Sequence, residues 1–284
     1  MAAVTLAVIQ IQYSIAGVRT RIMLLRSITE HVRTQNWFAV VLDFVIVVIG
    51  VYIGIQVSNW NDARLDAQRG EYFAARLLAD LQAEFLTYEQ ETDYYSTVHD
   101  YAVRAEELLD MDDPEFDNEF VVSAYNASQF IYAEPSQSTY DELLATGNLY
   151  LLKNENLRNA AIFLYSTTVR SRLSSHVRES AYRERLRRIM PYDVQQAVRE
   201  QCGDVIDEIT GFATSIPANC RIDFGIDRIA EATQVIRNDS LLRADLVYLL
   251  SSIGPYISDT VAVRRQAEQR LDGSYVNPAS LIAE

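Results

Sequence analysis

An uninterrupted apolar stretch near the N-terminus constrains this chain more than any other feature. Residues 37–57 read WFAVVLDFVIVVIGVYIGIQV and contain one ionisable side chain, Asp43, with Gln56 as the other strongly polar group. About 20 apolar residues are enough for a helix to cross a bilayer. The helices of soluble cores seldom stay apolar on every face over such a length. We therefore predict a transmembrane helix over residues 37–58.

Charge is distributed unevenly on the two sides of this stretch. Four arginines and one glutamate give residues 1–36 a charge of +3, whereas 21 basic and 37 acidic side chains give residues 58–284 a charge of −16. Arginines flank the stretch in similar numbers on both sides, so the positive-inside rule alone leaves the orientation open. The net-charge difference favours a cytoplasmic N-terminus and an exported acidic domain over residues 59–284. Such a domain repels phosphate backbones, which argues against nucleic-acid binding.

The basic segment before the stretch has its own helical pattern. Leu25, Ile28 and Val32 share one helical face, and Arg26 and Arg33 lie elsewhere. This pattern predicts a short amphipathic helix lying on the lipids of an anionic inner leaflet. Met23 offers a second plausible start of the chain.

One face of the apolar stretch carries an acid and two glycines. Asp43, Val47, Gly50 and Gly54 are separated by four, three and four residues, which places them on one side of a helix. A pair of small residues spaced in this way lets a second helix approach closely. We therefore expect a homo-oligomer formed through this face, the alternative being that the glycine pair is a chance feature. A carboxyl group in hydrocarbon suggests a function, unless Asp43 is shallow enough to reach the interface.

Beyond the stretch, the sequence favours helices. The chain has 10 Gly and 6 Pro, which are too few for the many turns of a sandwich or barrel. We predict an all-α protein in which the transmembrane helix continues into a membrane-tethered bundle of three long helices and several short ones. Ser138 with Asp141 is expected to cap one helix that stops at Gly147, and Asn154 to cap the next. The expected helices cover residues 61–112, 119–132, 138–147, 154–190, 193–199, 204–210, 226–237 and 240–271.

The chain has two cysteines, Cys202 and Cys220, separated by 17 residues. They can close a disulfide around the intervening loop if the domain lies in an oxidising compartment. The alternative is two unrelated free thiols.

A group of arginines stands out in the acidic domain. Arg183, Arg185, Arg187 and Arg188 lie on one expected helix and form a candidate surface for an acidic partner. The alternative is a solvated helix face whose arginines pair with Glu179 and Glu184, because exposed charges on helices commonly pair locally.

Sequence patterns of catalysis are missing. The chain has no glycine-rich phosphate loop, no His-Glu-x-x-His, no nucleophile elbow and no Cys-x-x-Cys. Its three histidines, His31, His99 and His176, lie on different segments, so we expect neither a metal site nor a cofactor. We therefore do not expect an enzyme, although a hydrolase with an unfamiliar site is a further alternative.

Three segments resemble a known family. These are LDFVIVVIGVYIGIQVSNWND, YFAARLLADLQAEF and STYDELLATGNLYLLKNENLRNAAIFLY. They resemble a large family of uncharacterised single-span bacterial membrane proteins, a domain of unknown function with an acidic residue in the span and an Asn-Trp-Asn exit. The corresponding residues here are Asp43, Gly50, Asn59 to Asn61, Gly147 and Asn148, and relatives commonly have Glu at the first position. The resemblance covers residues 35–170 well and implies a bacterial envelope protein without supplying an activity.

Together these features predict a single-pass protein of the bacterial inner membrane whose main domain is periplasmic. We expect a non-enzymatic helical protein that contacts membrane lipids, forms oligomers and binds a partner or ligand, such as an envelope protein, outside the inner membrane. The alternative is an ion-coupled or force-transducing subunit that uses Asp43 and works with a multi-span partner.

Overall fold

The computed structural model describes residues 37–208 and 211–274 of the chain. The described residues are mainly helical, which confirms the predicted all-α class at that level. The chain divides into two compact units, residues 1–65 and residues 66–284. The amphipathic helix predicted within residues 1–36 lies outside the described residues.

Helix α2 (Trp37–Leu108) includes the whole apolar stretch and part of the second unit. The other elements, in chain order, are η1 (Pro114–Phe116), α3 (Asp117–Asn126), α4 (Ser138–Ala145), η2 (Leu149–Leu151), α5 (Glu155–Ser166), α6 (Val169–Arg178), α7 (Ala181–Ile189), α8 (Tyr192–Cys202), β1 (Val205–Ile206), β2 (Ala213–Ser215), α9 (Ile226–Asn238) and α10 (Leu242–Asp272). By length and composition alone, two helices in the described ranges suit a membrane crossing, α2 and α10.

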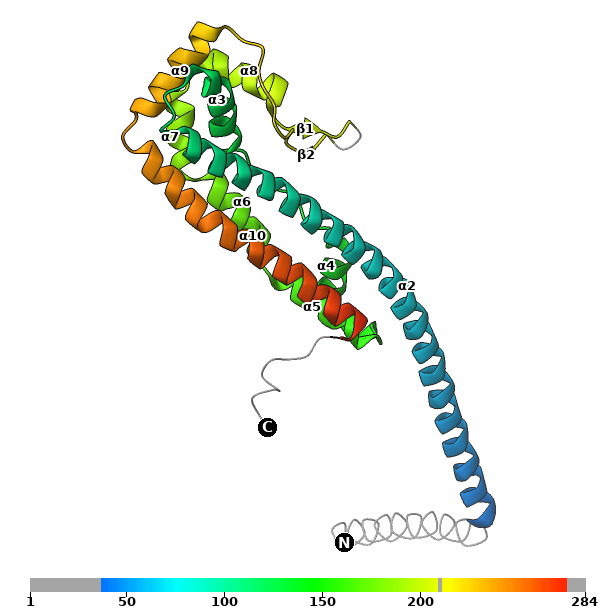
Figure 1. Cartoon of the computed structure of the whole chain (residues 1–284). Coiled ribbons are helices and arrows are strands. Elements are labelled where there is room, and N and C mark those ends of the chain that lie inside the picture. Colours follow the sequence, from blue (N-terminus) through cyan, green and yellow to red (C-terminus); the bar gives the residue numbers. More distant parts are fainter. Residues whose placement is uncertain (1–36, 209–210, 275–284) are drawn as a thin grey trace, which may run out of the picture. The chain divides into compact units, whose positions relative to one another are not determined.

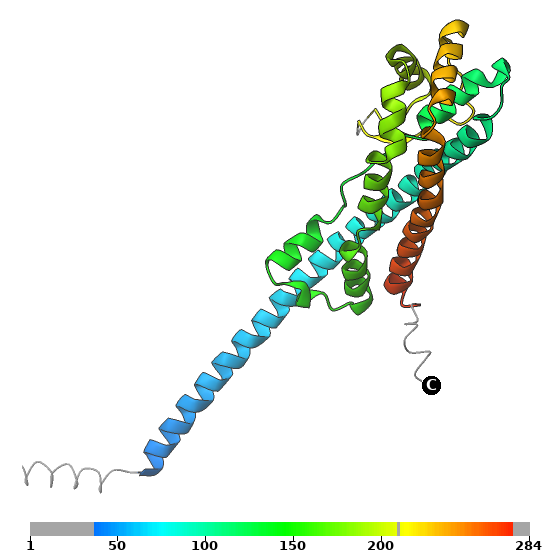
Figure 2. The ribbon, with the colours of Figure 1, turned by 90° about the vertical axis from the view of Figure 1, so that its left-hand side faces the viewer.

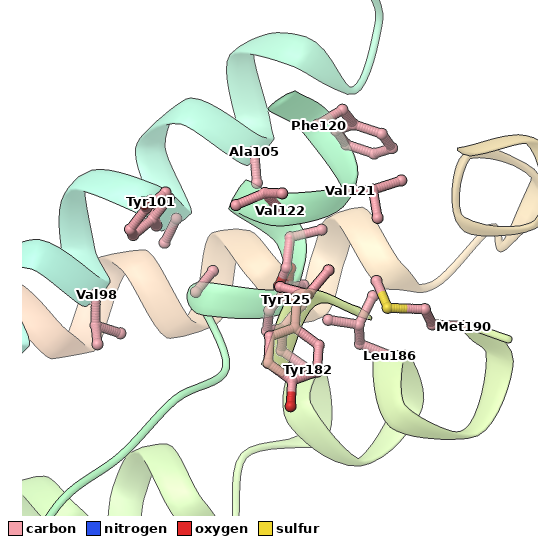
Figure 3. Packing of buried hydrophobic residues seen from close by; sticks show 14 of the residues in the cluster. Val98, Tyr101, Ala105, Phe120, Val121, Val122, Tyr125, Tyr182, Leu186 and Met190 are labelled. Carbon is pink, nitrogen blue, oxygen red and sulfur yellow. The ribbon is translucent and has the colours of Figure 1, made fainter. Parts of the chain in front are cut away.

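Two hydrophobic clusters hold the second unit together. The first joins residues 94–108 of α2 with α3, α7, α8, α9 and the first half of α10. The second joins residues 73–88 of α2 with α4, η2 and α5. Helix α10 packs against α5, α6 and α7, and the views in Figure 1 and Figure 2 show it running beside α5 and α6. The first cluster is rich in aromatic residues (Figure 3), and the buried Tyr182 donates a hydrogen bond to the Ala124 carbonyl at 2.9 Å.

The prediction of one long helix over residues 154–190 was wrong. The segment forms three helices, α5, α6 and α7. The first break is at Thr167, whose backbone is extended. The second is at Ser180, whose hydroxyl accepts a hydrogen bond from the Arg183 amide and caps α7. No Gly or Pro marks either break, and the β-branched threonines and the capping serine replace them.

Two further helix predictions differ from the structure. The helix expected over residues 119–132 ends at Asn126. The buried side-chain amide of Asn126 donates a hydrogen bond to the Cys202 carbonyl at 2.9 Å. Where a helix was expected over residues 204–210, the chain forms strand β1, which pairs antiparallel with β2. Backbone hydrogen bonds within this short hairpin therefore override the local helical pattern.

One of the two predicted helix caps is present in the structure, and the other is not. Asn154 caps α5 as predicted, with its Oδ1 accepting from the Leu157 amide at 3.1 Å. Ser138 makes no such bond, because the residue before α4 is Gln137 and has no capping side chain. Instead, Asp80 of α2 accepts from the Thr139 amide at 3.0 Å. Gly147 follows the end of α4 with a φ of 69°, a conformation that glycine adopts without strain.

Candidate functional site

The apolar stretch of α2 is not covered by any other part of the described chain. Every residue from Trp37 to Val57 is exposed, and none of its most apolar 18-residue window, of mean hydropathy 2.7, is buried. A Cβ added at Gly50 or Gly54 would meet nothing within 4 Å. Asp43 has no ion-pair partner among residues 37–208 and 211–274. The face formed by Asp43, Val47, Gly50 and Gly54 is therefore open for contact with lipid or another helix.

A second part of α2 has the opposite character, because it buries carboxylates. Glu84 and Glu91 are each 2 % exposed. Their oxygens accept hydrogen bonds from the backbone amides of Ser136 and Ala133, both at 2.9 Å. The two acids thus fix the irregular segment that leads into α4.

Arg170 of α6 neutralises part of this buried charge. Its guanidinium donates to both oxygens of Glu91, at 2.6 and 2.9 Å, and also to Glu84. It donates to the Ala133 carbonyl at 2.9 Å and lies over the ring of Tyr88, 4.9 Å from its centroid. Burial nevertheless raises the pKa of Glu84, against the opposing effect of Arg170. Two carboxylates share one guanidinium, so this network fixes α6 to α2.

The four arginines predicted as a partner surface lie in different environments. Arg183 donates to the Ser128 carbonyl and packs on the Phe130 ring. Arg187 lies 3.5 Å from the centroid of the Tyr125 ring and donates to Gln129 at 2.9 Å.

Arg185 and Arg188 complete the set. Arg185 pairs with Asp245 of α10 at 2.6 Å. Arg188 pairs with Glu184 and keeps 74 % of its side chain exposed. Three of the four arginines therefore serve internal contacts, and only Arg188 presents an exposed charge to a partner.

Cys202 and Cys220 are joined in a disulfide in the structure, with their Cα atoms 5.6 Å apart. Cys202 is the last residue of α8 and is buried, whereas Cys220 belongs to the loop between β2 and α9. The bridge fixes this loop to the end of α8. The hydrogen bond from Asn126 to the Cys202 carbonyl connects the same point to α3.

A groove of about 620 Å³ lies beside the disulfide. Tyr101 and Arg104 of α2, Phe116 of η1 and Ser123 of α3 line one part of it, and Arg221 of the disulfide loop lines another. Sequence reasoning did not find this groove, because its walls come from segments more than 100 residues apart. Spacing along α2 gave only a weak signal, since Thr97, Tyr101 and Arg104 share a helical face.

Two groups in the groove have unused hydrogen-bonding capacity. Ser123 is 1 % exposed, and its hydroxyl has no hydrogen-bond partner. Arg221 donates to the Glu115 carbonyl at 2.9 Å but has no ion pair within the described part of the chain. Arg104, in contrast, already binds Glu119 at 2.5 Å. The groove thus offers the guanidinium of Arg221 to a ligand, and the unsatisfied Ser123 hydroxyl is buried in its wall.

No family model, curated protein or solved structure matches this chain. The family resemblance of the three sequence segments therefore stays a prediction. Within the described ranges, no group of three or more His, Cys, Asp or Glu side chains is placed to hold a metal ion.

Proposed function

We propose that this chain is a membrane-anchored helical protein whose acidic domain binds a partner or ligand outside the bacterial inner membrane. The observation that carries the anchor is the complete exposure of the apolar residues 37–57. Exposing this many large apolar side chains to water is strongly unfavourable, at about 25 cal/mol per Å². A bilayer removes that cost, because all backbone groups of the helix are already bonded within it.

Helix α10 passes the same test of length and composition, but we assign it to the domain. Leu242, Leu246, Leu249 and Ile253 share a face and are buried in the first cluster. The described part of the chain then has one anchor, and residues 66–208 and 211–274 lie in water. The groove beside the disulfide gives this domain a surface of suitable size for a ligand or a short protein segment.

The orientation follows from charge and cysteine chemistry. A basic N-terminal segment favours the cytoplasmic side, and a disulfide persists in an oxidising compartment such as the periplasm. With this orientation the domain contacts other envelope proteins.

A reporter active only in the periplasm, fused after Glu284, tests this proposal together with a second fusion active only in the cytoplasm. We expect periplasmic activity and recovery of the chain in membranes washed with alkaline carbonate. Activity of the cytoplasmic reporter would contradict the orientation, and release by carbonate would contradict the anchor.

A second function is favoured by one observation: Asp43, within the apolar stretch, has no ion-pair partner among the described residues. A carboxyl group at this position suits an ion-coupled or force-transducing subunit that works with a multi-span partner. In that case Asp43→Asn abolishes co-purification of the partner or its activity and leaves membrane insertion intact. Gln56→Asn is the matched control at the other end of the stretch.

A further inference from the structure

Helices α6 and α10 face each other with matching stripes of polar and aromatic side chains. Arg172 and His176 lie four residues apart on α6, and Tyr248, Ser252 and Tyr256 follow the same spacing on α10. The two helices pack side by side (Figure 1). Nε2 of His176 lies 2.6 Å from Oγ of Ser252, so the imidazole of one stripe meets the hydroxyl of the other.

The hydrogen bonds of Ser252 indicate which way this pair is protonated. Its hydroxyl lies 2.8 Å from the Tyr248 carbonyl and 3.1 Å from the Leu249 carbonyl. A hydroxyl has one proton to donate. All of these groups are satisfied if Nε2–H of His176 donates to Ser252 and Ser252 donates to its own helix.

This direction is opposite to that of a serine nucleophile, which donates its proton to histidine. In addition, no carboxylate among the described residues binds the other nitrogen of His176, as the orienting acid of a triad would. Burial lowers the pKa of His176 from its ordinary value, because it disfavours the charged imidazolium. The pair is therefore suited to binding rather than to nucleophilic catalysis.

The two stripes border a hollow of about 370 Å³. Three rings form its aromatic part. The centroid of His176 lies 5.2 Å from that of Tyr256, with planes at 45°, and 6.1 Å from that of Tyr248, with planes at 55°. Ser175, Ser180 and Arg172 add polar groups. The volume falls within the usual range for small-molecule sites.

Several hydrogen-bonding groups in this hollow are not used within the described part of the chain. Arg172 is exposed and has no ion-pair partner within residues 37–208 and 211–274. The hydroxyls of Tyr248 and Tyr256 also have no hydrogen-bond partner there. The acid that lines the hollow, Glu179, is already paired with Arg178 at 2.8 Å. The guanidinium of Arg172 therefore has no acidic partner in the described part of this acidic domain.

We propose that the hollow between α6 and α10 binds a small organic anion in which a carboxylate or phosphate is attached to a flat ring. Arg172 donates two parallel hydrogen bonds to the anionic group, a geometry that guanidinium shares with carboxylate and phosphate. Tyr248, Tyr256 and His176 pack against the ring. This site is separate from the groove beside the disulfide and does not depend on the side of the membrane on which the domain lies.

Four probes test the proposal by calorimetry on the full chain in detergent: benzoate, phenyl phosphate, benzyl alcohol and inorganic phosphate. We expect at least one ring-bearing anion to bind saturably and to shift the imidazole NMR signal of His176. The His176→Asn variant lacks this signal and therefore assigns it. Benzoate and phenyl phosphate distinguish the two anionic groups. Benzyl alcohol lacks the charge and should bind about tenfold or more weakly, because a charge-assisted pair contributes about that factor. Inorganic phosphate keeps the charge but lacks the ring, and it should also bind more weakly because it makes no aromatic contact.

Two variants separate the site from nonspecific attraction. Arg172→Gln should weaken binding of the ring-bearing anion about tenfold or more. Arg188→Gln removes an exposed arginine outside the hollow and should leave binding unchanged. Thermal melting by circular dichroism verifies that both variants fold. The proposal is overturned if neither ring-bearing anion binds, if benzyl alcohol binds equally well, or if the two variants weaken binding equally.

Discussion

Two parts of helix α2 invert the usual rule of burial. Residues 37–57 expose isoleucine, valine and phenylalanine side chains, whereas the part that includes Glu84 and Glu91 buries two carboxylates. The difference lies in what surrounds each part. Arg170 and backbone amides surround the acids, and no group in the described part of the chain covers the apolar residues. Composition alone therefore does not decide burial, because each side chain requires surroundings of matching polarity.

The largest effect should come from removing the partner of the buried acids. Arg170→Ala leaves Glu84 and Glu91 buried without a cation, which costs about 3–5 kcal/mol of stability. Chemical denaturation followed by circular dichroism measures the change in the free energy of unfolding. Arg188→Ala, at an exposed and locally paired arginine, should change it by less than about 0.5 kcal/mol. Equal losses in the free energy of unfolding for Arg170→Ala and Arg188→Ala would contradict the stabilising role of the buried Arg170.

Truncation of apolar side chains should sharpen the contrast within α2. Leu81 is fully buried in the second cluster, so Leu81→Ala should cost about 2–5 kcal/mol in unfolding of the domain. Ile49 is exposed, and Ile49→Ala should change that free energy by less than about 0.5 kcal/mol. A large loss for Ile49→Ala would show that protein, and not lipid, covers the apolar stretch.

The glycines of α2 give a third comparison. A Cβ at Gly70 would lie 2.4 Å from the Leu151 carbonyl oxygen, so Gly70→Ala should cost about 1–3 kcal/mol of stability. Gly54 is open, and Gly54→Ala should leave domain stability unchanged. Replacement of Gly54 by Ile, in contrast, should lower self-association in membranes, measured by cross-linking, if this face packs on a second copy. Unchanged cross-linking would remove Gly54 from the predicted packing face.

The smallest effect is a change in pH dependence. Because the pKa of Glu84 is raised above 4.5, the folded protein keeps a proton on this carboxyl where the unfolded chain has lost it. Its contribution to stability is therefore present below pH 4.5 and is lost as the pH rises through the raised pKa.

Glu84→Gln removes this titration. Its stability relative to that of the unchanged protein should rise with pH through the same window, as measured by melting temperatures from pH 4 to about pH 8. Asp93→Asn, at an exposed acid of the same helix, is the control and should show no such trend. A flat difference for Glu84→Gln would contradict the raised pKa.

Much of the helical structure could be predicted because its signals are local. The cap at Asn154 and the stop at Gly147 depend on neighbouring residues, and both match the structure. Strand β1 was missed because it exists through pairing with β2. The Ser138 cap was missed because Asp80, almost 60 residues earlier in the chain, supplies the acceptor instead.

The candidate sites were harder to predict, for the same reason. Glu84 and Glu91 lie at positions of the apolar stripe of α2, which is a signal of buried acids that sequence reasoning did not use. Their partner Arg170 is 79 residues beyond Glu91, and spacing along the chain does not identify it. The groove and the hollow are likewise built from distant segments.

Cysteine labelling in intact membranes tests the central contrast most directly. Ile49 and Leu86 are both exposed apolar residues of α2, at 51 % and 67 %, and the native cysteines are joined in a disulfide. Ile49→Cys and Leu86→Cys are each treated with a water-soluble maleimide, before and after solubilisation with denaturant. We expect Leu86→Cys to react in both conditions and Ile49→Cys to react only after solubilisation, because lipid covers it. Equal labelling of the two positions in intact membranes would contradict the anchor.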